Sequence, residues 1–303
     1  MGLCWLQTNF RLVRVIMGGV ILMTLPLSFS TSTGQAADRT HGGYYSAERI
    51  ANLRRNVERF DWAARQRDEA VAKARIWVAK SDEELWNMIP GQDLPRCIDV
   101  TWDYKYDQEP HLGCLKCGDA IKKFGNYPYE PDFENKPWKL TCPSCGVVFP
   151  TNDFGAYYRS GLDESGQFRP DRADRSLLFN AEHPDPEDPL HKYGVDDGFG
   201  FVDANGRVHK FIGYYTWKFW RYLTYNGVGS LAAAYLYTGD KTYARKAAIM
   251  LDRIADVYPD MDWAPYARLG WYHSDGGTRT GKVEGSIWEA SFLANLASSY
   301  DMI

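Results

Sequence analysis

The chain has 303 residues, of which 45% are hydrophobic and 24% are charged, a balance typical of folded globular proteins. This composition excludes a disordered tail, a collagen and a bare coiled coil. The formal net charge of −4 excludes the global positive field that draws proteins to polyanions, so we expect no nucleic-acid partner.

The first 36 residues have the pattern of a secretory signal peptide. Arg11 and Arg14 precede an uncharged stretch at 15–37, whose first part is strongly apolar and is broken by Pro26. Small residues follow as far as Ala36, where we expect cleavage. An uncleaved anchor helix is the alternative, but the apolar core is shorter than the ~20 residues that a span needs. We therefore expect a periplasmic or secreted protein with no stable membrane anchor.

The next part of the chain predicts helix. From Ser46 to about Leu85 the sequence is charged, rich in Ala and almost free of Gly and Pro, with an approximately helical spacing of its apolar residues. Pro90 and Pro95 then end the helical region, and the sequence from there to about Ile212 is dense in turn-forming residues. This middle part predicts loops, turns and short strands.

Helical patterns return near Tyr214. A long apolar and aromatic run predicts a helix at 214–237, a turn ends at the N-cap residue Asp240, and a second amphipathic helix follows at 241–257. A further helix is expected from about Ser286, with Ile287, Ala290, Ala294 and Ala297 on one stripe. Because the sequence stops at Ile303 without a capping residue, we expect the chain to be an N-terminal fragment.

Paired cysteine motifs are the strongest local signal. Cys114, Cys117, Cys142 and Cys145 form two C-x-x-C-G motifs, and 24 residues separate the pairs. Four thiolates at this spacing can bind one Zn(II) tetrahedrally, and the Gly after each pair allows a tight backbone turn. Two disulfides are the alternative in an oxidising compartment, but the following glycines favour a metal. Four Cys ligands leave no position for water, so the zinc is expected to be structural. Cys97 is expected to be a small buried residue.

Several segments together resemble heparinase II/III-like proteins. They are 56–63 near the start, the double cysteine motif running into 149–154, then 157–163, 193–198 and 233–240. The resemblance covers most of 45–303. It implies an (α/α) toroid of helical hairpins followed by β-sheet domains, with the toroid incomplete in this chain and part of the site beyond Ile303.

The expected fold class is therefore mainly α, an incomplete (α/α) toroid with a loop-rich, zinc-ribbon-like insertion. The expected segments are a signal peptide at 1–36, a helical segment at 37–99, the zinc-ribbon-like insertion at 100–160, a loop-rich connection at 161–212 and toroid helices at 213–303.

The resemblance also implies a polysaccharide lyase that cleaves uronic-acid-containing, acidic polysaccharide by β-elimination. Such a reaction needs a group that neutralises the sugar carboxylate, a base and an acid. Two places offer these side chains. Tyr225 and Asn226 lie within the first long C-terminal helix, and a Gly-rich loop carries Trp271, Tyr272, His273 and Arg279. We expect His273, Tyr225 and Asn226 to be catalytic and Arg279, Trp271 and Tyr272 to bind substrate.

Each assignment has a plainer alternative. Tyr225 and Asn226 would satisfy each other's hydrogen bonds in the core, and the loop would be a surface loop with one structural His. For the whole protein, the alternatives are a non-catalytic carbohydrate-binding or structural exoprotein and a glycoside hydrolase with a similar toroid. An unsaturated product that absorbs ultraviolet light separates elimination from hydrolysis.

Overall fold

The computed structural model describes residues 42–100, 113–125, 127–261 and 281–303. All of them belong to one compact unit, which covers residues 40–303. This part of the chain is mainly helical, with a few short strands, as the sequence predicts. No described helix is long and apolar enough to cross a membrane.

The predicted N-terminal helical region is three helices. These are α1 (Ala47–Arg59), α2 (Asp61–Val78) and α3 (Asp82–Asn87). The Ser46 side chain accepts a hydrogen bond from the backbone N–H of Arg49 and begins α1, as expected of an N-cap. Phe60 has an extended backbone, so α1 and α2 meet at an elbow that the sequence pattern does not predict. Ser81 and Glu84 form a capping box at the start of α3.

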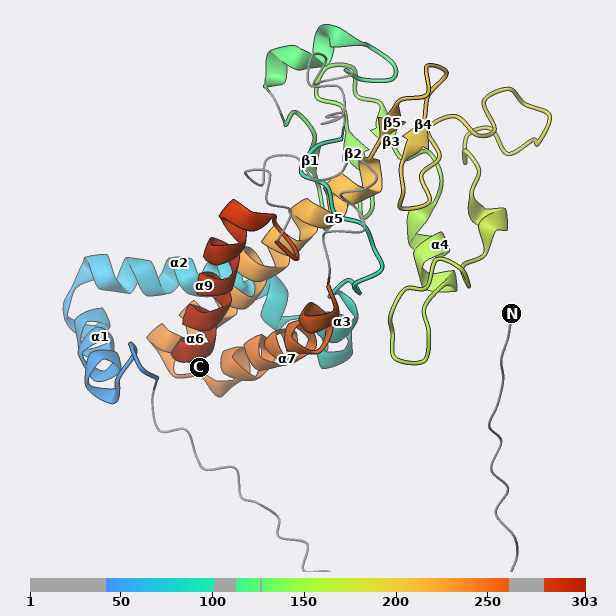
Figure 1. Ribbon diagram of the computed structural model, residues 1–303. Helices are drawn as coiled ribbons and strands as arrows, with labels where there is room; N and C mark the ends of the chain where they lie inside the picture. The colour runs from blue at the N-terminus through green and yellow to red at the C-terminus, as the bar shows by residue number, and fades with distance from the viewer. Residues whose placement is uncertain (1–41, 101–112, 126, 262–280) are drawn as a thin grey trace, which may run out of the picture. The chain divides into compact units, whose positions relative to one another are not determined.

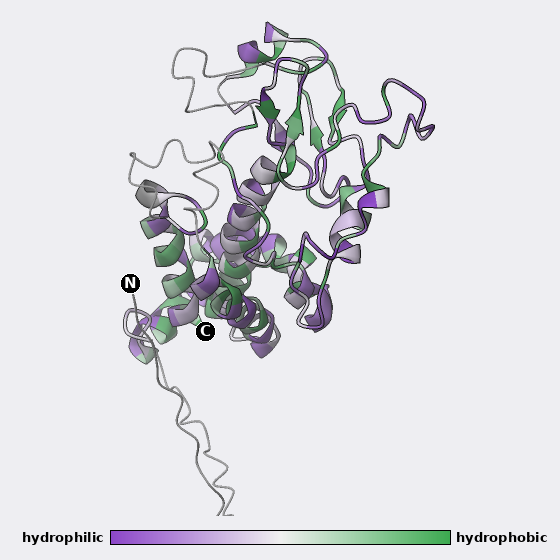
Figure 2. Cartoon of the chain, turned by 45° about the vertical axis from the view of Figure 1, so that its right-hand side comes forward, coloured by the Kyte–Doolittle hydropathy of each residue, from purple (hydrophilic) through white to green (hydrophobic). Residues whose placement is uncertain are grey.

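Short strands and short helices make up the loop-rich middle of the chain. Strands β1 (Glu130–Pro131), β2 (Leu140–Thr141) and β3 (Val148–Phe149) form an antiparallel sheet in that order, and β4 (Phe201–Val202) pairs with β5 (Val208–His209). The helical pieces here are η2 (Asp119–Phe124), α4 (Phe154–Ser160) and η3 (Arg175–Leu177). Figure 2 shows green, hydrophobic stretches among the strands, and Leu140, Val148 and Phe149 are apolar residues of the three-stranded sheet. The sheet thus has apolar residues to pack on the helix that follows it.

One long helical run begins at Phe211. It consists of α5 (Phe211–Arg221), a π-helical segment η4 (Tyr222–Val228) and α6 (Gly229–Thr238). Asp196 fixes the start of this run, because its buried carboxylate accepts hydrogen bonds from the backbone N–H groups of Gly198, Gly200 and Ile212. The predicted long helix is confirmed, but it begins earlier and contains a π-helical segment.

The remaining helices match the predicted ones closely. Helix α7 (Lys241–Val257) begins at its N-cap residue Asp240, the short η5 (Tyr258–Asp260) follows it, and α9 covers Ser286–Met302. Ala290, Ala294 and Ala297 of the expected stripe lie on an exposed face of α9, and Phe292 is buried.

Helix α6 is the centre of the helical packing. It contacts α2, α7 and α9, and α6 and α7 form a helical hairpin. Figure 1 shows α9 beside α6, and α5 leading from the strands toward α6. Fully buried side chains such as Trp77, Trp220, Leu223 and Met250 fill the space between these helices. The helices and the sheet share this apolar core.

A carboxylate from helix α9 binds the backbone of the segment that precedes helix α1. The Asp301 carboxylate accepts hydrogen bonds from the backbone N–H groups of Gly43, Tyr44 and Tyr45, over distances of 2.6, 2.9 and 3.0 Å. Helix α9 therefore holds the segment that leads into α1.

Candidate functional site

The first candidate site is the set of four cysteines, and its local geometry follows from the glycines. In each C-x-x-C-G motif the Gly adopts a positive φ, +56° at Gly118 and +73° at Gly146. Backbone hydrogen bonds then close the turns, with the Gly118 N–H donating to the Cys114 carbonyl and the Gly146 N–H donating to that of Cys142. These left-handed positions favour glycine, so the motif's glycines serve the turn as predicted.

The four Sγ atoms lie within 4.8 Å of one another and could hold one metal ion. Across the two motifs, the Sγ atoms of Cys114 and Cys145 are 3.9 Å apart and those of Cys117 and Cys142 are 3.8 Å apart. The backbone N–H of Lys116 points at the Cys114 sulfur at 3.4 Å. The predicted association of the four cysteines is confirmed, and their donor set is the one that closes a tetrahedral zinc site. Cys97 is buried apart from them.

Burial raises the pKa of the Cys117 and Cys142 thiols, whereas at Cys145 burial is outweighed by hydrogen bonds, first from the backbone of Val147, which lower the pKa. Burial raises the pKa of the Cys142 thiol to about 12. A divalent metal reverses the preference of Cys142 for its protonated form, because it binds the thiolate and displaces the proton. The site is thus chemically matched to a metal.

The second candidate site is a polar cavity of about 450 Å³ between α2, the η4–α6 run and α9. We call it the polar cavity. Its lining residues are Gln66, Glu69, Ala70, Lys73, Tyr225, Asn226, Gly229, Ser230, Ala233, Tyr237, Asn295, Ser298, Ser299 and Met302. Hydroxyl, amide, ammonium and carboxylate groups thus face one space, as in sites that bind polar small molecules or sugars.

The π-helical segment η4 presents two of the predicted residues to this cavity. Tyr225 is half-buried and Asn226 is exposed, and the described residues show no hydrogen bond between their side chains. The alternative, in which the Tyr225 and Asn226 side chains form a hydrogen bond with each other in the core, is therefore wrong. π-helical turns widen a helix locally and occur frequently at functional sites.

The two glycines near Tyr225 have different roles. A methyl group on Gly227 would lie 2.7 Å from the Met250 side chain and 3.2 Å from the Trp77 ring. Gly227 therefore allows η4 to pack against its neighbours, and it does not line the cavity. Gly229 does line the polar cavity, where an added methyl group would meet only ordinary contacts of 3.4 Å or more.

A charged cluster lies behind Tyr225. The Arg221 guanidinium lies 5.5 Å from the Tyr225 ring centre and donates to the buried Glu284 carboxylate at 2.8 Å. Burial, and then the negative charge of Glu284, raise the pKa of Tyr225, although Arg221 opposes them. Tyr225 is therefore a phenol at neutral pH, able to donate a proton. Burial also raises the pKa of Glu284 to about 7.

The other predicted site residues lie outside the described residues. These are Trp271, Tyr272, His273 and Arg279. Of the predicted site residues, Tyr225 and Asn226 therefore line the polar cavity. Residues 271–279 lie outside the described residues.

Sequence reasoning missed the helical partners of Tyr225. Gln66, Glu69 and Lys73 form one stripe on α2, and Asn295 and Ser298 form another on α9. The signal that could have found them is a polar residue at each third or fourth position of an otherwise amphipathic helix. A stripe of polar residues on one helix usually just faces solvent. It forms part of a site only when the neighbouring helices place further polar side chains opposite it.

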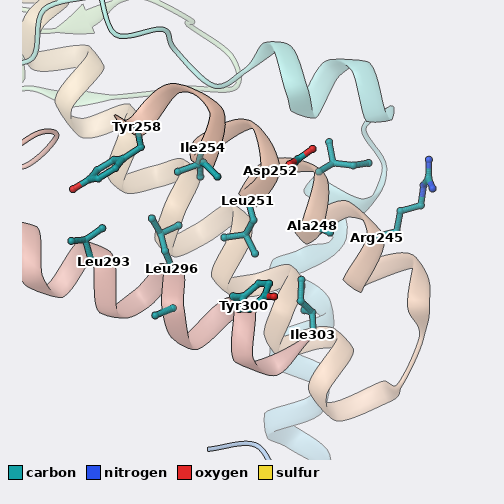
Figure 3. Close-up of a pocket in the computed structure, with 13 residues that line it drawn as sticks. Arg245, Ala248, Leu251, Asp252, Ile254, Tyr258, Leu293, Leu296, Tyr300 and Ile303 are labelled. Atoms are coloured by element: carbon teal, nitrogen blue, oxygen red, sulfur yellow. The ribbon is translucent and has the colours of Figure 1, made fainter. Parts of the chain in front are cut away.

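A third cavity in the described part of the chain has a different character. It is a groove of about 730 Å³ between α7 and α9, with apolar side chains such as Leu251, Ile254 and Leu296 along its walls (Figure 3). At one end Arg245 is already paired with Asp82 outside the groove. Because few polar groups converge here, the groove suits an apolar surface better than a sugar.

No protein-family model, curated protein or solved structure matches this chain.

Proposed function

We propose that this chain is part of an exported polysaccharide lyase of the heparinase II/III type, which cleaves uronic-acid-containing polysaccharide by β-elimination within an incomplete (α/α) toroid. The observation that carries the proposal is the polar cavity, where Tyr225 and Asn226 meet Lys73 across the helices. The resemblance in sequence supplies the reaction class, and the cavity supplies side chains that this reaction needs.

The proposed roles follow from charge and protonation. Asn226 and Lys73 donate hydrogen bonds to the uronate carboxylate, which stabilises the charge that builds up when the neighbouring ring proton is removed. A base takes that proton, the C–H electron pair forms the ring double bond, and the glycosidic C–O bond breaks. Tyr225, whose raised pKa keeps it protonated, gives its proton to the departing oxygen.

His273 is our proposed base, and Arg279, Trp271 and Tyr272 are our proposed substrate contacts. These four residues lie outside the described residues, and their roles rest on the sequence alone.

The polar cavity favours elimination over hydrolysis. Glycoside hydrolases use a pair of carboxyl groups on either side of the scissile bond. Among the described residues that line the cavity, Glu69 is the single carboxyl group. A toroid hydrolase therefore has less support here than a lyase.

We also propose that the cysteines bind one structural Zn(II). The four thiolates would complete its tetrahedral coordination, so the metal would fix the two turns and take no part in the reaction. Metal analysis of the purified protein should give about one zinc per molecule. Two disulfides and no metal would contradict this proposal.

The test of the proposed reaction is product chemistry. The protein is incubated with a panel of uronate polymers, namely alginate, pectate and heparan sulfate, and ultraviolet absorbance is followed together with reducing ends. New reducing ends with a matching rise in absorbance support elimination. Reducing ends without absorbance indicate a hydrolase, and binding without either product indicates a carbohydrate-binding protein.

A further inference from the structure

A second cavity lies at the elbow between α1 and α2. It has a volume of about 330 Å³ and is lined by Arg49, Asn52, Leu53, Asn56, Trp62, Ala63, Gln66 and Tyr237. We call it the elbow cavity. The elbow forms where Phe60 leaves the helical conformation, and this break turns the first residues of α2 toward α1. Nothing in the proposed chemistry of Tyr225 uses this space.

Two large aromatic side chains stand exposed at the elbow. Trp62 is 50% exposed and Phe60 is 48% exposed, and their rings stack with centres 6.1 Å apart. Burying such rings would stabilise the fold, so two adjacent exposed ones mark a surface that binds something. Trp62 is the one of the two that lines the elbow cavity.

Polar groups surround Trp62 on the helix faces. Asn52 and Asn56 from α1 and Gln66 from α2 supply amides, each of which can donate and accept hydrogen bonds. Arg49 also lines the cavity. One of its terminal nitrogens donates to the Tyr44 carbonyl at 2.9 Å, and a guanidinium has four further N–H donors. An aromatic face, three amides and a guanidinium fit a sugar ring that carries a carboxylate.

The elbow cavity and the polar cavity share a wall. Gln66 and Tyr237 line both of them, and the Tyr237 hydroxyl donates to the Gln66 side-chain oxygen at 3.2 Å. A chain of linked sugars that crosses this pair would touch both cavities. A compact small molecule would occupy only one.

We propose that the elbow cavity is a second subsite, which binds an acidic sugar unit of the polysaccharide remote from the bond that is cleaved. This inference rests on the proposed function, since it adds a second binding site for the uronic-acid polymer on which the polar cavity is proposed to act. Trp62 stacks against the sugar ring, Asn52 and Asn56 bind its hydroxyl groups, and Arg49 binds its carboxylate. The apolar surface of a partner protein would leave these amides and the guanidinium unpaired.

The test compares oligosaccharides of two lengths. Uronate disaccharides and hexasaccharides, prepared from whichever of alginate, pectate or heparan sulfate binds the wild-type protein, are titrated calorimetrically against the full chain. Trp62→Ala should weaken hexasaccharide binding about tenfold and leave disaccharide binding at the polar cavity unchanged. Trp62→Phe keeps a flat ring and should restore most of the affinity. Arg49→Gln should weaken binding of the acidic hexasaccharide and leave a neutral hexasaccharide of glucose unaffected.

The control is Phe124→Ala, which removes an aromatic residue of similar exposure, 45%, from η2. It should bind both lengths as the wild type does, and circular dichroism shows that each variant is folded. Equal hexasaccharide affinity for Trp62→Ala and wild type would overturn the subsite and leave the proposed function standing. If the wild type binds no uronate oligomer and yields no unsaturated product, the proposed function fails and the subsite fails with it.

Discussion

Tyr225 is a phenol that the helix holds at the wall of a polar cavity. Burial raises the pKa of Tyr225 above the ordinary tyrosine value, so the side chain is protonated at neutral pH, as an ordinary tyrosine is. Its proposed role as the acid rests on this protonation state and on its place at the cavity.

We predict that Tyr225→Phe lowers kcat by about 10²–10⁴ on the uronate polymer that the protein cleaves, with little change in KM. The ring is kept, and the proton that the leaving oxygen needs is lost. Tyr300→Phe on the exposed surface of α9 is the matched control and should keep full activity. Full activity in Tyr225→Phe would show that another residue gives the proton to the leaving oxygen.

Glu284 gives a pH dependence of stability. Its pKa is raised to about 7 in the folded protein because the carboxyl is buried, although Arg221 partly compensates. The ordinary value is 4.5, so between about pH 4.5 and 7 the unfolded chain loses its proton first. The free energy of unfolding should therefore fall across this window as pH rises, by up to about 3 kcal/mol from this group.

Glu284→Gln checks that expectation, because a neutral amide replaces the titrating group. Urea unfolding at pH 4, 5, 6, 7 and 8 should show a flatter profile for the variant than for the wild type. A profile of unchanged slope would assign the effect to other groups.

At the scale of elements, the close packing of η4 depends on a missing side chain. Gly227→Ala should lower the free energy of unfolding by about 1–3 kcal/mol, since the new methyl group meets Met250 and Trp77. Gly229→Ala provides the control. Its methyl group has room, and the better helix propensity of alanine should leave stability unchanged or raise it by up to about 1 kcal/mol. Equal destabilisation of both variants, measured by urea unfolding, would count against this packing.

The sequence pattern predicts most elements well and the site only in part. Asp240 and Ser46 begin helices as their side-chain chemistry dictates, and the cysteine motifs come together as their spacing requires. The elbow at Phe60 is not visible in the sequence, because the residues on both sides favour helix. The partners of Tyr225 on α2 and α9 escape prediction for a related reason. They come from separate helices, and only tertiary packing brings them to one cavity.

At the scale of the molecule, one helix connects the two candidate sites. Helix α5 begins against the sheet, where Phe211 stacks on Phe149 at 4.6 Å, and continues through η4 into the polar cavity. The Tyr214 hydroxyl also donates to the Tyr129 carbonyl at 2.9 Å. The part of the chain that carries the cysteine cluster is thus anchored to the same helical run that carries Tyr225.

We predict that Cys142→Ser destabilises the segment around the cysteines more than helices α6 and α7. If the four cysteines hold a structural metal, as proposed, the turns around them lose that support, so residues 113–125 and 127–149 should become more sensitive to limited proteolysis. Helices α6 and α7, which lie in the main core, should stay protected. Lys116→Ala within the first motif is the control, because it keeps the backbone N–H that points at the Cys114 sulfur, and it should behave as the wild type. Equal protection of 113–149 in Cys142→Ser and wild type would contradict a structural metal.

The Asp301 carboxylate has a consequence for the order in which the protein folds. Its hydrogen-bond partners, residues 43–45, lie 256–258 positions earlier in the chain. Contacts of such long sequence separation form late, because the intervening chain must first be ordered. During synthesis, α1 and α2 emerge long before α9 exists, so the segment that leads into α1 waits for its anchor until almost the whole described chain has been made. We therefore expect this contact to be among the last to close as the helices pack together.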